Sequence, residues 1–159
     1  MCVQHWLMKS EPDEFSITDL ERAPRQTTSW FGVRNYQARN YMREMKVGDR
    51  AFFYHSSCPE PGIAGIAEIV AAAHPDVTQF DAGGKYYDVK ATREEPRWWN
   101  VDVRWRSTTR LVSLAELRAS EALSDMVILR RGNRLSITPV TKQEWDVVTK
   151  LAVRRPPKA

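Results

Sequence analysis

A ten-residue run near the middle of the chain, RWWNVDVRWR at residues 97–106, alternates apolar and polar side chains almost without a break. The apolar set is Trp99, Val101, Val103 and Trp105, and the polar set is Asn100, Asp102, Arg104 and Arg106. Successive side chains of a β-strand point to opposite faces, so this pattern predicts a strand with one buried face and one face in water. Other elements must then cover the buried face.

Four further segments are predicted strands because apolar, β-branched and aromatic residues fill them and turn residues bound them. They are residues 4–10, 50–56, 63–73 and 134–140. The turn from Pro59 to Gly62 separates the second from the third, so we expect those two strands to pair as a hairpin.

Three helix starts are marked by a Ser or Thr that is followed three residues later by an acidic residue, the pattern of a capping box. The pairs are Ser16 with Asp19, Ser113 with Glu116, and Thr141 with Glu144. In each case an apolar residue before the cap can pack on another inside the first turn. Short helices are therefore predicted over residues 15–24, from 113, and over 142–152.

An amphipathic helix is predicted from Asn35 to the Gly48-Asp49 turn, because one helical face gathers Ala38, Tyr41, Met42 and Met45. Asn35 is the expected N-cap. A further short helix is expected over residues 124–133, ended by Gly132.

Strands interleaved with short helices, without a regular strand-helix-strand rhythm, indicate a mixed α+β domain. We expect a curved sheet or small, mixed β-barrel flanked by short helices. At 159 residues the chain fits one domain, expected over residues 1–153 and followed by a flexible basic tail at 154–159.

Composition adds a few limits. The net charge of +4 permits a polyanionic partner without requiring one. Of the 24 basic residues, 17 are Arg, a side chain suited to phosphate contacts and to stacking on bases. A GC-rich genome would produce the same excess of Arg. Two cysteines, with no Cys-x-x-Cys pair, favour a reducing compartment, so a cytoplasmic protein is predicted. No membrane segment is predicted, and a monomer is expected.

Common catalytic motifs are missing from the chain, among them the phosphate-binding loop, the dinucleotide fingerprint and the serine elbow. No cofactor and no metal are expected. His55 and Cys58 could form an imidazole-activated thiol, but a Cys before a Pro in a turn is more often a small apolar filler. An enzyme acting on nucleobases or nucleotides through His55, Cys58 or Glu68 stays an alternative.

Trp30 stands outside any strand or helix periodicity, just before a helix start, where an indole can stack on a planar ligand. Polar side chains also gather at three predicted strand termini, where they could converge on one pocket. They are Lys9 and Ser10 after the first strand, Tyr54, His55 and Ser56 after the second, and Arg97 with Trp98 before the alternating strand.

The chain resembles the EVE domain family of the PUA-like superfamily, which is related to the YTH and ASCH domains. The resemblance is carried by strings in order over nearly the whole length: MKSEPDEFSI, WFGVRNYQARN, MKVGDRAFFYHSSC, PGIAGIAEI, PDVTQFD, PRWWNVDVRW and LRRGNRLSITPV. It implies a PUA-like fold and a nucleic-acid-binding protein, not an enzyme, that reads a modified base such as 5-methylcytosine or a modified RNA nucleotide.

For the base pocket, the resemblance adds weight to Trp30, Lys9, Ser10, Tyr54, His55 and Ser56, with Trp98 as a second wall. Asn35 is included as a possible ligand contact, although helix capping explains it more simply. Arg34, Arg39 and Arg97 are expected to contact the phosphate backbone on chemical grounds. A module that binds a peptide or a small acidic metabolite is the remaining alternative.

Overall fold

The computed structural model describes residues 3–153, and its main feature is a six-stranded sheet within those residues. The strands are β1 (His5–Ser10), β2 (Thr27–Ser29), β3 (Arg50–His55), β4 (Gly62–Pro75), β5 (Trp99–Ser113) and β6 (Ile137–Val140). Their order across the sheet is β2-β5-β4-β3-β1-β6. The two edge strands, β2 and β6, do not pair with each other, so the barrel is open.

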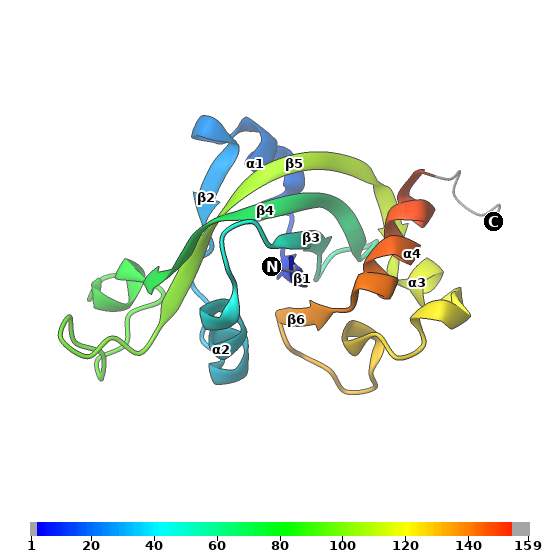
Figure 1. Ribbon diagram of the computed structural model, residues 1–159. Coiled ribbons are helices and arrows are strands. Elements are labelled where there is room, and N and C mark those ends of the chain that lie inside the picture. Colours follow the sequence, from blue (N-terminus) through cyan, green and yellow to red (C-terminus); the bar gives the residue numbers. More distant parts are fainter. Residues whose placement is uncertain (1–2, 154–159) are drawn as a thin grey trace.

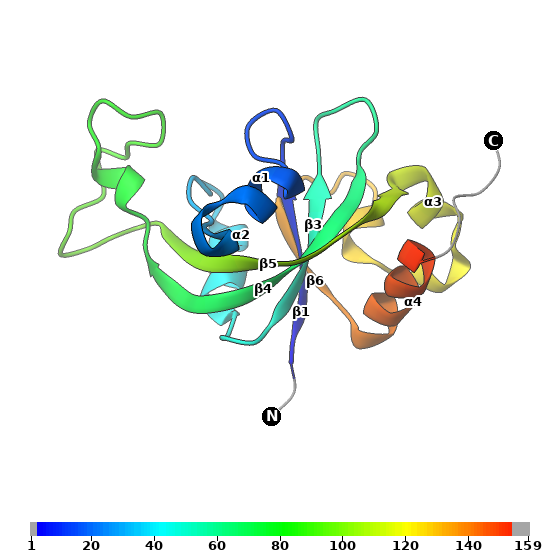
Figure 2. The same ribbon diagram turned by 90° about the horizontal axis from the view of Figure 1, so that it is seen from above.

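Strand direction determines where the strand ends lie. β1 and β3 are parallel neighbours, whereas every other neighbouring pair in the sheet is antiparallel. β4 and β5 are the longest strands and arch together across the molecule, with β1 and β3 crossing below them (Figures 1 and 2). The predicted hairpin of β3 and β4 is confirmed.

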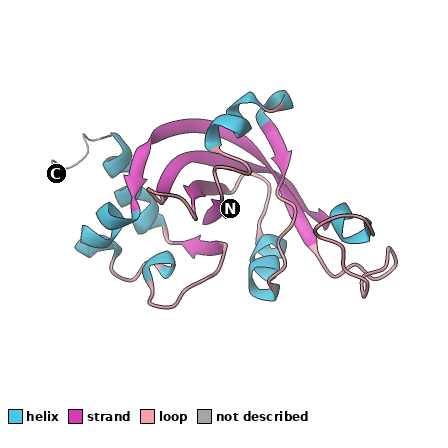
Figure 3. Ribbon diagram, turned by 180° about the vertical axis from the view of Figure 1, so that it is seen from behind, coloured by secondary structure: helices cyan, strands magenta, loops and turns pink. Residues whose placement is uncertain are grey.

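The curved sheet carries a hydrophobic cluster on each of its faces, because alternate residues of one strand enter different clusters. Met8 and Phe53 belong to the first cluster, which the two helices α1 (Ile17–Arg22) and α2 (Tyr36–Glu44) help to close. Leu7 and Phe52 belong to the second, which α3 (Leu114–Ala119) and α4 (Lys142–Val153) help to close. Figure 3 shows these helices around the curved strands.

The four α-helices of residues 3–153 begin at the capping residues predicted from the sequence. Ser16 and Asp19 form a reciprocal capping box at α1, and Thr141 and Glu144 form another at α4. Ser113 caps α3, although the Glu116 carboxylate pairs with Arg110 instead of returning to the cap. Asn35 caps α2 by accepting a hydrogen bond from the Ala38 N–H.

Two predictions about local structure are wrong. Residues 124–133 form only a 3₁₀ turn at Val127–Leu129, because the buried side chains of Met126 and Ile128 are two residues apart and cannot share one face of an α-helix. Asn100, expected on the wet face of β5, is only 3% exposed and lies within hydrogen-bonding distance of His74.

The mixed α+β class and the curved sheet flanked by short helices, both predicted from the sequence, are confirmed, with β2 as an added short strand. The basic tail expected at residues 154–159 lies outside the described residues. No helix of residues 3–153 is long and apolar enough to span a membrane.

Candidate functional site

A cavity of about 550 Å³ opens at the edge of the sheet where β1 and β3 end. Its size is in the range of sites that bind small organic groups. Most of its lining comes from two stretches, residues 9–15 and 28–34. The remaining lining residues are Ser56, Ser57, Tyr86, Arg134 and Ser136.

Parallel pairing of β1 with β3 brings two of the predicted polar strand ends together. Lys9 lies opposite Tyr54 and Ser10 opposite His55, and the pairing continues as the Ser56 N–H donates to the Ser10 carbonyl at 3.0 Å. The carboxyl ends of neighbouring parallel strands meet at one edge of a sheet. Lys9, Ser10 and Ser56 therefore share the cavity wall.

Trp30 forms the aromatic part of this wall. Its backbone N–H donates to the Val101 carbonyl at 2.8 Å, which extends the pairing of β2 with β5 by one residue. Its indole packs edge-to-face on Phe53 with the ring centroids 5.4 Å apart, and only 9% of the residue is exposed. The core therefore fixes one side of the indole while part of the residue lines the cavity.

Lys9 is a basic residue in the cavity lining. Within residues 3–153 its ammonium makes no hydrogen bond and no ion pair, and its one recorded contact is with the Tyr54 ring, 5.9 Å from the ring centroid. Burial lowers the pKa of Lys9 below its ordinary value. A half-buried ammonium without a carboxylate partner is an available donor for an acceptor atom on a ligand.

The hydroxyl groups around Lys9 differ in how they are engaged. The Ser10 hydroxyl donates to the Phe15 carbonyl at 2.6 Å and so holds the segment that joins β1 to α1. The Ser56 hydroxyl has no hydrogen-bond partner in the described part of the chain, and Ser57 beside it adopts a positive φ of 53°. Ser56 is thus the freer of the two hydroxyls.

Tyr54 and His55 do not line the cavity. Tyr54 is 3% exposed and packs in the second hydrophobic cluster, because strand alternation turns it away from the face that holds Phe53. The Nε2 atom of His55 accepts a hydrogen bond from the Ile17 N–H at 3.1 Å, and burial lowers its pKa. His55 thereby anchors the start of α1 as a neutral acceptor.

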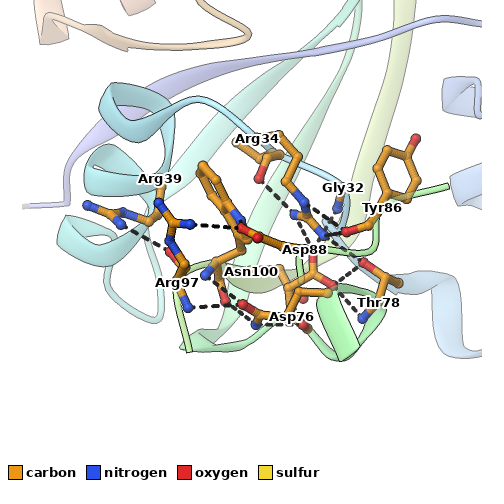
Figure 4. A network of polar contacts seen from close by, with 12 residues as sticks. Gly32, Arg34, Arg39, Asp76, Thr78, Tyr86, Asp88, Arg97 and Asn100 are labelled. Atoms are coloured by element: carbon orange, nitrogen blue, oxygen red, sulfur yellow. Dashed lines mark hydrogen bonds and ion pairs between the residues drawn. The ribbon is translucent and has the colours of Figure 1, made fainter. Parts of the chain in front are cut away.

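A second polar cluster shares Gly32, Arg34 and Tyr86 with the cavity wall and continues behind it to Asp76 and Thr78. We call these five residues the Asp76 network. Arg34 donates to the Asp76 carboxylate at 3.1 Å, to the Thr78 hydroxyl at 3.1 Å and twice to the Tyr86 carbonyl at 2.8 and 3.2 Å. A fifth hydrogen bond goes to the Val33 carbonyl at 2.9 Å. All five guanidinium N–H groups are thus occupied (Figure 4).

The carboxylate of Asp76 is fully buried and accepts hydrogen bonds on both oxygens. Its partners are the Gly32 N–H, the Arg34 guanidinium, and the N–H and hydroxyl of Thr78. Burial alone would raise the pKa of Asp76, but these hydrogen bonds outweigh burial and lower the pKa below its ordinary value. The network therefore holds a paired, ionised carboxylate that fixes the Gly32 backbone.

Trp98, predicted as a second wall, lies beside this network and does not line the cavity. Its indole N–H donates to Asp88 at 2.7 Å, and its ring stacks on Tyr36 at a centroid distance of 5.0 Å. Arg39 and Arg97 lie over the Tyr36 ring, at 4.8 and 5.8 Å from its centroid. We call Tyr36, Arg39, Arg97 and Trp98 the α2 stack. Together they form a partly exposed cationic surface.

Each arginine of the α2 stack also has contacts within the fold. Arg39 donates to the Arg97 carbonyl at 3.0 Å, and Arg97 pairs with Asp88 at 3.5 Å (Figure 4). Arg97 also donates to the Tyr36 hydroxyl. Asn35, one residue before Tyr36, acts as the helix cap and does not line the cavity.

Most of the cavity lining was not identified from the sequence, including Phe31, Tyr86 and Arg134. Phe31 follows Trp30 directly, and a second aromatic in the same loop was the available signal. Tyr86 and Arg134 come from loops more than fifty residues from Trp30 in sequence, and no local pattern marks them. Among residues 3–153, no group of three or more His, Cys, Asp or Glu side chains is placed to hold a metal ion.

Comparison with protein families decides the relationship. The EVE domain family matches residues 4–151. This chain belongs to the EVE domain family. The resemblance seen in the sequence is confirmed.

Several EVE relatives are closely similar. Human thymocyte nuclear protein 1 is 47% identical over 170 residues, covering 96% of this chain and 75% of that protein. A crystal structure of a Pseudomonas putida protein is 49% identical, with a TM-score of 0.90 over 94% of this chain and 99% of the other. The structure of the human THYN1 protein in complex with 5-methylcytosine-containing DNA is 46% identical, with a TM-score of 0.92 over 96% of this chain and 99% of that one.

The EVE fold is also similar to a YTH domain. The YTH domain of the Zygosaccharomyces rouxii MRB1 protein, solved in complex with N6-methyladenosine RNA, has a TM-score of 0.54 at 15% identity. The alignment covers 99% of this chain and 88% of that one. At that identity the likeness concerns the fold alone.

Proposed function

We propose that this chain binds nucleic acid and holds one modified base in the cavity between Trp30 and Lys9. The observation that carries the proposal is that one cavity is lined both by a core-anchored indole and by a lysine whose ammonium has no carboxylate partner among residues 3–153. The indole offers a surface for stacking on a planar base, and the ammonium offers a donor to the acceptor edge of that base. The Ser56 hydroxyl supplies a second polar contact.

The first modification to test is 5-methylcytosine, because a relative that is 46% identical over nearly the whole chain was solved with DNA containing that base. Cytosine carries two neighbouring acceptors, O2 and N3, which an ammonium can contact. The methyl group would lie against apolar lining such as Phe15 and Val33. We propose that the selectivity for the methyl group arises there.

The proposal is tested by titrating the protein into labelled oligonucleotides that differ by one methyl group, with binding followed by fluorescence anisotropy. We expect the wild-type protein to prefer the methylated strand. Trp30→Ala should weaken that binding by about tenfold or more, since one stacking contact is worth about 1–3 kcal/mol. Equal affinity of wild-type protein for both strands, and for strands with N6-methyladenine, would overturn the proposal.

Two controls separate binding from folding in this test. Trp30→Phe keeps a ring on Phe53 and should recover part of the affinity. Trp105 is partly buried on β5 and does not line the cavity, so Trp105→Ala should leave the affinity unchanged. Thermal unfolding of every variant identifies any loss of affinity that follows from loss of structure.

We also propose that Arg39 and Arg97 of the α2 stack contact phosphate groups, while Arg34 has a structural role because all five of its donors are occupied. Phosphate contacts release counterions, so affinity should fall as salt rises. Arg39→Gln should make the salt dependence shallower by about one counterion, and Arg34→Gln should act mainly by destabilising the fold.

Binding without chemical turnover is the proposed mode. Two of the three residues considered for catalysis have other tasks, since His55 Nε2 accepts from Ile17 and the Glu68 carboxylate pairs with Arg104 and Arg106. The third, Cys58, does not line the cavity. Mass spectrometry of a modified nucleoside after long incubation should return it unchanged. A cytoplasmic location remains our proposal from the cysteine content.

A further inference from the structure

Phe31 is an exposed aromatic residue at the wall of the cavity. It is 54% exposed, although it follows the buried Trp30 directly and lines the same cavity. An exposed phenyl ring costs free energy in water and contributes little to the core. Its position at the wall of a proposed base-binding cavity leaves the ring free to contact a ligand.

The ring of Phe31 is supported from within the fold. It packs edge-to-face on Tyr86 with the centroids 5.9 Å apart. Tyr86 in turn lies against Gly32, where an added Cβ would come within 2.8 Å of the tyrosine ring. The Tyr86 carbonyl accepts two hydrogen bonds from Arg34, which is anchored on buried Asp76 (Figure 4). The Asp76 network therefore holds an exposed ring in place.

We propose that Phe31 is a wedge that enters the base stack of a duplex when the modified base leaves it for the cavity. The inference rests on the proposed function and deepens it by naming the substrate as a double strand. Taking a base out of a duplex costs pairing and stacking free energy, and an apolar side chain inserted into the gap recovers part of the stacking. A flexible ring would recover less stacking free energy, because ordering it would cost entropy. The contact with Tyr86 reduces that cost by holding the ring in place.

The wedge differs in its consequences from a ring that stacks on a neighbouring base in any strand. A single strand has no gap in a paired stack, so a wedge contributes little there. A matched duplex requires the full cost of extrusion, and a duplex with a mismatch opposite the modified base requires less. The effect of removing the ring should follow that order.

The test compares wild-type protein and Phe31→Ala on one 5-methylcytosine strand in three forms: single, in a matched duplex, and in a duplex with a mismatch opposite the modified base. We expect Phe31→Ala to weaken binding to the matched duplex by about tenfold, to the mismatched duplex by less, and to the single strand by no more than about twofold. Phe31→Tyr keeps a ring and should retain most of the duplex affinity. Tyr87 is also exposed but does not line the cavity, so Tyr87→Ala should change none of the three affinities.

Equal loss in all three forms, no loss in any, or wild-type binding to the single strand but not to the duplex would overturn the wedge. These outcomes differ from failure of the proposed function, in which wild-type protein shows no preference for the modified base in any form. Phe31 is exposed, so Phe31→Ala should unfold at the wild-type temperature, and unfolding curves for each variant check this directly.

Discussion

The cavity and the Asp76 network both contain arginine or lysine, hydroxyl groups and aromatic rings, but they differ in how many polar atoms have partners. In the network, Asp76 accepts hydrogen bonds on both oxygens and Arg34 uses all five donors. In the cavity, the Lys9 ammonium and the Ser56 hydroxyl lack hydrogen-bond partners among residues 3–153. Both groups are partly exposed to the cavity, so they are available to bind a ligand.

The difference separates two roles that look alike in the sequence. Arg34 lines the cavity, yet all five of its donors are used within the fold, where they hold Asp76 and Tyr86. Tyr86 in turn supports Phe31. Lys9 makes no such contacts. We therefore expect substitutions in the network to lower the stability of the fold first, and substitutions in the cavity to lower affinity with little change in stability.

The largest expected effect is that of Arg34→Ala. It leaves the buried Asp76 carboxylate without its cation, and breaking a buried pair in this way costs about 3 kcal/mol. Urea unfolding should show the loss directly. If the free energy of unfolding changes by less than about 0.5 kcal/mol, the size expected of a surface substitution, Arg34 is not structural. The contrast between the network and the cavity would then be wrong.

Gly32→Ala should come next, at about 1–3 kcal/mol. Gly32 has a φ of +84°, and an added Cβ would lie 2.8 Å from the Tyr86 ring. Gly132→Ala is a matched control, because Gly132 has a φ of +77° but nothing within 4 Å of an added Cβ. The amount by which Gly32→Ala lowers stability more than Gly132→Ala is the cost of the clash with Tyr86. Equal losses of stability would show that this clash is unimportant. Thermal unfolding provides both values.

Lys9→Met tests the cavity side of the comparison. It removes the ammonium while keeping an apolar stem, so binding to the modified base should weaken by about tenfold, or about 1.4 kcal/mol. The free energy of unfolding should stay the same or rise, because a partly buried charge is lost. Anisotropy titration and urea unfolding on the same sample give the two values. Lost stability with unchanged affinity would reverse the roles assigned to the two regions.

The smallest effect is expected from pH. Burial lowers the pKa of His55 below its ordinary value of 6.5, so the unfolded chain binds a proton more readily than the folded chain. The free energy of unfolding is therefore highest when His55 is neutral, and it falls as the pH falls below about 6.5. Protonation also removes the acceptor for the Ile17 N–H.

The measurement is the unfolding temperature of wild-type protein and His55→Gln between about pH 7.5 and 5. The glutamine keeps an acceptor oxygen but cannot titrate, so the pH dependence should be shallower. Part of the dependence should remain, because burial also lowers the pKa of His5. Identical profiles for the two proteins would show that His55 does not titrate with unfolding.

Much of the fold could be predicted because its signals are local. Capping residues such as Ser16 and Asn35 mark helix starts in a few letters, and the alternation in β5 marks its buried face. The three residues of β2 carry no such pattern and form a strand only by pairing with β5. Asn100 is buried for a similar reason, because His74 from the neighbouring strand is its partner.

The site was less predictable because it depends on contacts between distant segments. The polar ends of β1 and β3 were recognised, but their meeting depends on parallel pairing that no single segment determines. Tyr86 comes from a loop whose position depends on Arg34 and Gly32. The sequence could suggest that Trp30 binds a ligand, but it could not indicate which arginine has free donors.

The position of the bound methyl group tests most directly whether the cavity, and not the α2 stack, holds the modified base. A 5-methylcytosine oligonucleotide with a ¹³C-labelled methyl group, bound to the protein, reports its neighbours through nuclear Overhauser effects. The account predicts cross-peaks from this methyl to protons of the cavity lining, Trp30 foremost. Cross-peaks to Tyr36 and Trp98 of the α2 stack, with none to Trp30, would contradict it.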